Sequence, residues 1–210
     1  NFKKNEKTNK IPFIFQSGII SQEQELRKKH RRARKMMLLF SLLSITMTFA
    51  GLTSAYIVSK SRPDWLVDFQ LPDYFISSTL VIVLSSISMW LAKKSIKNDD
   101  FSKTSFWIGS TFLLSVLFVI SQFLGFQELI SKGYYFTGAQ STVTTSFLYV
   151  LSMLHLVHVI AGMIVLIVVY VNNKKNKYKD EKLGFELAET FWHFLGFLWL
   201  YLFVFLYFFR

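Results

Sequence analysis

Five long apolar runs without a formal charge divide this chain into regular segments. They cover residues 36–59, 74–92, 104–127, 145–171 and 190–209. At about 1.5 Å per residue in a helix, runs of this length cross a hydrocarbon core about 30 Å thick. The pattern predicts an all-α fold, a polytopic membrane bundle of five transmembrane helices.

The fourth run is the longest and contains two histidines. His155 and His158 are three residues apart and share one helical face, with Ala161 and Gly162 one turn further on. A polar pair is costly among acyl chains. We therefore expect both rings to face protein, lipid headgroups or water.

The distribution of Lys and Arg predicts the orientation of the bundle. Of the 24 basic residues, 20 lie before the first run or in the second and fourth connections, and four lie on the opposite side. This asymmetry predicts a cytoplasmic N-terminus and an external C-terminus. Residues 1–35 form a basic N-terminal arm, with a helix expected to start at Ser21, and residues 36–210 form the membrane domain. The excess of Lys and Arg on the cytoplasmic side also explains the net charge of +11, so no nucleic-acid partner is expected.

The types of residue inside the runs restrict the chemistry. The chain has no cysteine, which excludes disulfides and thiolate metal sites, and no Asp, Glu, Lys or Arg lies within the runs. A transporter with its own ion path usually needs such a group. We expect no catalytic, metal-binding or cofactor-binding residue in this chain, and an accessory role.

Polar residues near the runs are candidates for lipid or interface contacts. Glu189 and His193 are four residues apart and can pair on one face, and Gln122 suits a hydrogen bond between helices. The candidates are His155, His158, Glu189, Trp192, His193 and Gln122. Small residues that let helices pack closely are Ala50, Gly51, Ala55, Ser85, Ser86, Gly162 and Gly196.

A haem-b membrane anchor linked to quinone is one alternative, in which His155 or His158 would act with His193. Counted from the run ends, His158 and His193 differ in depth by about 7 Å, whereas two axial ligands need nearly equal depth. This count disfavours haem ligation.

Five motifs occur in an order that resembles subunit III of the haem–copper terminal oxidases, the cytochrome c oxidase subunit III family. They are Phe49-Ala50-Gly51, Ser85-Ser86-Ile87-Ser88, Gln122-Phe123-Leu124-Gly125, His155-Leu156-Val157-His158-Val159 and Trp192-His193-Phe194. The resemblance covers about residues 36–209 and matches the five-helix form. Two departures concern carboxylates: the family's membrane Glu falls near Ile45, and its Asp falls at Gly196.

The resemblance implies a cofactor-free accessory subunit of a respiratory complex in a bacterial inner membrane. The complex would reduce oxygen with electrons from cytochrome c or quinol and translocate protons, with haem and copper in partner subunits. The implied partners are catalytic subunit I, subunit II, phospholipids and a respiratory supercomplex. The implied roles are to stabilise subunit I, hold lipid, and support proton uptake and oxygen access. A nitric oxide reductase system, which also includes relatives of this family, is the other alternative.

Overall fold

The computed structural model describes residues 13–66, 72–138, 141–179 and 181–209, and within these ranges the chain is helical without strands. The α-helices are α1 (Phe13–Val58), α2 (Asp73–Lys97), α3 (Phe101–Ser131), α4 (Val143–Lys174) and α5 (Leu183–Phe208). Two short 3₁₀ turns, η1 (Ser59–Ser61) and η2 (Lys177–Lys179), follow α1 and α4. Five helices in the described ranges are long and apolar enough to cross a membrane, which confirms the predicted fold.

The helices extend beyond the apolar runs. α2 continues five residues past the second run, and α5 begins at Leu183, seven residues before the fifth run. Charged residues at helix ends can reach the aqueous interface while their backbone keeps its helical hydrogen bonds. An apolar run therefore marks the membrane-embedded part of a helix and not its ends.

Helix α1 begins at Phe13, so the predicted helix start at Ser21 is wrong. Pro12 directly precedes the helix, and proline is tolerated at a helix start but not in its interior. The chain divides into two compact units, residues 1–40 and 41–210, and the division lies within α1. In the first unit every described side chain from Gln22 to Met37 is exposed.

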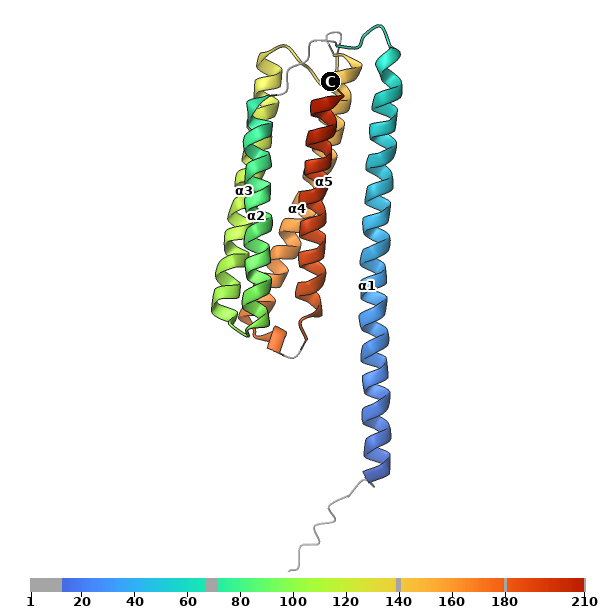
Figure 1. Cartoon of the computed structure of the whole chain (residues 1–210), viewed down its shortest axis with the longest axis vertical. Coiled ribbons are helices and arrows are strands. Elements are labelled where there is room, and N and C mark those ends of the chain that lie inside the picture. The colour runs from blue at the N-terminus through green and yellow to red at the C-terminus, as the bar shows by residue number, and fades with distance from the viewer. Residues whose placement is uncertain (1–12, 67–71, 139–140, 180, 210) are drawn as a thin grey trace, which may run out of the picture. The chain divides into compact units, whose positions relative to one another are not determined.

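The connections between the helices are short and locally capped. Asp99 adopts a left-handed φ of 56° between α2 and α3, and the Asp100 side chain accepts a hydrogen bond of 3.1 Å from the Lys103 backbone N–H. The hydrogen bond from the Lys103 ammonium lowers the pKa of Asp100. At the start of α4, Thr142 and Thr145 form a reciprocal capping box. These caps allow consecutive helices to run in opposite directions (Figure 1).

Helices α2 to α5 form a closed bundle, in which α2 contacts α3, α3 contacts α4, α4 contacts α5, and α5 returns to α2. The second part of α1 belongs to the same unit and presents Phe49, Thr53 and Tyr56 to it. The Thr53 hydroxyl lies 3.0 Å from the Tyr201 hydroxyl of α5. On the other side of α1, Ala50, Gly51 and Ala55 are exposed.

Candidate functional site

An ion pair joins α2 and α5 near the end of the bundle at which α5 begins. Lys93 Nζ donates to Glu189 Oε1 at 2.8 Å, and His193 Nε2 lies 3.6 Å from the same oxygen. The Glu189 side chain is only 7% exposed, whereas that of Lys93 is 39% exposed. The predicted pair of Glu189 and His193 is thus present, but the closer partner of the carboxylate is a lysine from another helix.

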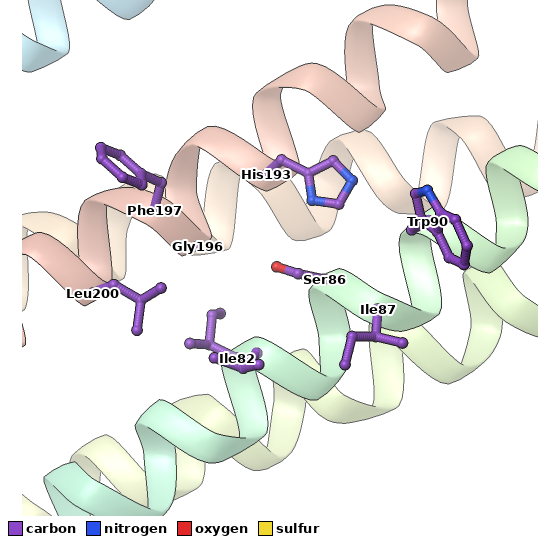
Figure 2. A pocket seen from close by; sticks show the side chains of 9 residues that line it. Ile82, Ser86, Ile87, Trp90, His193, Gly196, Phe197 and Leu200 are labelled. Atoms are coloured by element: carbon purple, nitrogen blue, oxygen red, sulfur yellow. The ribbon is translucent and has the colours of Figure 1, made fainter.

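An apolar groove of about 380 Å³ runs between α2 and α5 beside this ion pair. Figure 2 shows Trp90 and His193 towards one end of the groove, and Ile82 and Leu200 towards the other. Ser86 and Gly196 lie between these ends, and a Cβ atom placed on Gly196 would approach the Ser86 hydroxyl to 2.8 Å. The glycine therefore allows α5 to pack closely on α2 along the groove.

A second polar group lies inside the bundle, towards the end at which α2 begins. Gln122 Nε2 donates to Ser78 Oγ at 2.8 Å, and Trp199 Nε1 donates to Thr79 Oγ1 at 3.0 Å. The ring of His155 lies 5.1 Å from that of Trp199. We call Ser78, Thr79, Gln122, Ser152, His155 and Trp199 the polar layer, to which all four helices α2 to α5 contribute.

The two histidines of α4 have different surroundings. His155 is completely buried and lies among the rings of Phe49, Phe118 and Trp199. His158 is half-buried, and its Nδ1 lies 2.8 Å from the Leu154 carbonyl oxygen. Since a carbonyl only accepts, this Nδ1 carries the proton. His155 is the histidine that belongs to the interior of the bundle.

Trp192 connects α5 to both of its neighbours. Its Nε1 donates to Ser85 Oγ on α2 at 3.3 Å, and its ring lies 3.1 Å from the position of a Cβ atom on Gly162 of α4. At Gly51, in contrast, a Cβ atom would meet nothing within 4 Å. Gly162 and Gly196 thus lie at helix contacts inside the bundle, whereas Gly51 faces away from the described parts of the chain.

The arrangement of the histidines does not suit a pair of axial haem ligands. His155 lies against Trp199, and His193 is six residues before Trp199 on α5. Six helical residues correspond to about 9 Å along the helix axis. The rings of His155 and His193 therefore lie at different levels, and the count from the run ends gives a depth difference of about 7 Å for His158 and His193. In the residues that the structure describes, no group of three or more His, Asp or Glu side chains could hold a metal ion.

Sequence reasoning missed several residues of these two polar groups. The sequence pattern does not distinguish Lys93 and Trp90 as candidates, nor Ser78, Thr79 and Ser152. Lys93 directly follows the second run, and in the predicted topology it lies on the same side of the membrane as Glu189. This shared side is the signal that could have indicated Lys93 as a partner of Glu189. Nothing in the spacing of the serines and threonines distinguishes those that bind another helix from those that bond to their own backbone.

Comparison with known proteins finds relatives that match most of this chain. The family model described as cytochrome c oxidase subunit III matches residues 20–210. The chain is 30% identical to cytochrome c oxidase subunit 3 of Bacillus sp. (strain PS3), over 77% of this chain and 79% of the relative. It is 37% identical to the cytochrome bo(3) ubiquinol oxidase subunit 3 of Buchnera aphidicola, over 79% of this chain and 86% of the relative.

The chain belongs to the cytochrome c oxidase subunit III family. It is therefore an accessory subunit of a haem–copper oxidase, a multi-pass membrane protein that functions in a complex with other oxidase subunits. The relatives include both cytochrome c oxidases and a ubiquinol oxidase.

Proposed function

We propose that this subunit III stabilises the catalytic subunit I of a respiratory oxidase and holds phospholipid against the assembled complex. The haem and copper of oxygen reduction would lie in the partner subunits, among them subunits I and II. We place the complex in a bacterial inner membrane with the N-terminus cytoplasmic, because the basic residues gather on that side and several relatives are bacterial. Association with a larger respiratory assembly belongs to the same proposal.

The observation that carries the function is the family match over residues 20–210. The test is to purify the tagged chain from its own membranes in mild detergent and to identify the chains that accompany it. A haem-bearing partner with many helices and a haem–copper visible spectrum are expected. Isolation of the chain alone, or with partners that carry no haem–copper centre, would overturn the proposal. A nitric oxide reductase partner would support the alternative assembly instead.

The groove between α2 and α5 is the proposed lipid site. Its walls are apolar, and Lys93, His193 and Trp90 lie near the end at which α5 begins. Cationic and indole groups are suited to the headgroup level of a membrane, and an apolar groove of this kind suits an acyl chain. Glu189 neutralises much of the charge of Lys93, so the site would accept a phosphate through hydrogen bonds more than through net charge.

Native mass spectrometry of the intact oxidase tests this lipid site. Val83 lines the groove, whereas its neighbour Leu84 is exposed and does not line it. A Val83→Trp variant should fill the groove and lose one retained phospholipid per complex. The matched Leu84→Trp variant should retain it. Equal lipid content in both variants would refute this site while leaving the subunit assignment intact.

The exposed side of α1 is the proposed contact with a partner helix. Ala50, Gly51 and Ala55 are exposed there, and Gly51 has open space around it. Small residues at this spacing let helices approach closely in lipid, where no hydrophobic force drives them together.

Support for proton uptake would not use carboxylates at residues 45 or 196, since Ile45 and Gly196 occupy these positions. Glu189 is the one acidic residue buried among the described residues.

A further inference from the structure

Three members of the polar layer have buried atoms that no described protein group satisfies. These atoms are Gln122 Oε1, Ser152 Oγ and both ring nitrogens of His155. The three side chains are at most 1% exposed. Most buried polar atoms in proteins have a hydrogen-bond partner, either another protein group or an ordered water molecule. Four unsatisfied atoms in one layer therefore point to a further hydrogen-bonding partner inside the bundle.

The directions of the helices bring these atoms to the same region. The Phe118 ring on α3 lies 6.0 Å from the His155 ring on α4, which places these two residues at one level. Gln122 lies one turn from Phe118 towards the end of α3, and Ser152 lies one turn from His155 towards the start of α4. Because a short connection joins these two helix ends, both steps go in the same direction along the bundle.

The hydrogen-bonding capacities of the atoms complement one another. Gln122 Oε1 is a carbonyl oxygen and can only accept, whereas the amide nitrogen of the same side chain donates to Ser78. The Ser152 hydroxyl can donate and accept, and a neutral imidazole offers one N–H and one acceptor nitrogen. A water molecule donates two hydrogen bonds and accepts two, and it needs two to four polar partners when it is buried. A metal ion would find no carboxylate or thiolate here, and an acyl chain would leave every one of these atoms unsatisfied.

We propose that the polar layer is a binding site for internal water, in which one or two molecules link Gln122, Ser152 and His155. The water would connect α3 to α4 in the same layer in which Gln122 and Trp199 already connect α3 and α5 to α2. It would also fix the orientation of the His155 ring against Trp199. The site lies inside the bundle and differs from the proposed lipid groove, which Ile82 and Gly196 line between α2 and α5.

Solid-state NMR of the assembled oxidase with ¹⁵N-labelled histidine in this subunit tests the site. Magnetisation transfer from water protons to the His155 ring nitrogens is expected, with the signal assigned by its absence in His155→Asn. His193, whose side chain is 35% exposed, serves as the positive control in the same spectrum. Transfer to His155 should fall at least severalfold in a Gln122→Leu, Ser152→Ala double variant. Transfer to His193 without transfer to His155 in the unmodified complex would show a dry layer and overturn the proposal.

The sign of a stability change gives a second test. If water binds Ser152, the Ser152→Ala variant loses a hydrogen bond, and the melting temperature of the subunit in the complex should fall by about 2–4 °C. If the layer is dry, removal of an unsatisfied hydroxyl leaves the melting temperature unchanged or raises it, which contradicts the proposal. Ser77→Ala is the matched control, because the exposed Ser77 hydroxyl donates only to the Tyr74 carbonyl of its own helix.

Discussion

Lys93 on α2 and Glu189 on α5 form an ion pair with an Nζ···Oε1 distance of 2.8 Å, and only the lysine is substantially exposed. The two charged groups differ in their access to water. The lysine can extend its ammonium towards water or headgroups, whereas the carboxylate remains enclosed by the bundle. Near a membrane edge, such a pair joins two helices that lie far apart in the sequence.

We expect Lys93→Met to destabilise the subunit more than Glu189→Gln does. Loss of the lysine leaves a buried carboxylate without its cation, whereas loss of the carboxylate frees a lysine that reaches water. Because Lys93 is partly exposed, screening reduces the effect to about 1–2 kcal/mol. Thermal unfolding of the purified complex measures the difference, with the exposed Lys94→Met as control. A larger loss of stability in Glu189→Gln than in Lys93→Met would contradict this prediction, because it would show that the unpaired buried carboxylate is not the main cost.

Gly196→Ala should weaken the contact between α5 and α2. The added Cβ atom would approach the Ser86 hydroxyl to 2.8 Å, so this hydroxyl must turn away or the two helices must separate slightly, at a cost of about 0.5–1.5 kcal/mol. A Gly196→Ala, Ser86→Ala double variant removes the obstructing oxygen and should recover most of the stability. The measurement is the melting temperature of the four proteins of this cycle. Additive losses in the double variant would mean that Ser86 is not the obstacle.

Gly51→Leu should leave the internal stability of the bundle unchanged and weaken assembly with the catalytic subunit. A Cβ atom at this position has no described atom of the chain within 4 Å, so the larger side chain should not disturb the bundle. The same side chain would hold α1 away from a partner helix. The recovery of catalytic subunit with the tagged chain measures assembly, and thermal unfolding measures the bundle. Met47→Leu on the same helix is the control, since its side chain is exposed and already large. Full recovery of the partner with Gly51→Leu would place the interface elsewhere.

His193→Leu should reduce lipid retention or association with the partner more than it reduces the initial rate of oxygen reduction. The ring lines the groove beside Glu189 and lies outside the polar layer. Native mass spectrometry and oxygen consumption by the same preparation compare the two effects. A tenfold fall in the initial rate of an intact, lipid-replete complex would assign His193 a direct part in turnover.

Much of the fold follows from local properties of the chain. Apolar runs of 19 to 27 residues without charges require helices in a membrane, because lipid offers no partner for backbone polar groups. The helix ends differ from the predicted spans because polar residues can continue a helix into the interface, as α5 does from Leu183 to Thr190. Local spacing also predicted that Glu189 and His193 lie on one face, since four residues make about one helical turn.

The pairings between helices were decided by the tertiary structure alone. Ser78 and Ser77 are adjacent serines in the same run, yet one accepts a hydrogen bond from Gln122 and the other is exposed. The difference depends on how α2 is rotated against α3, and this rotation results from the packing of all the side chains between them. The sequence by itself determined that this chain is a helical membrane protein of a recognisable family. The tertiary structure decided which polar side chains meet inside the bundle, because these contacts depend on how the helices rotate and pack against one another. The order of residues along the chain does not specify that rotation directly.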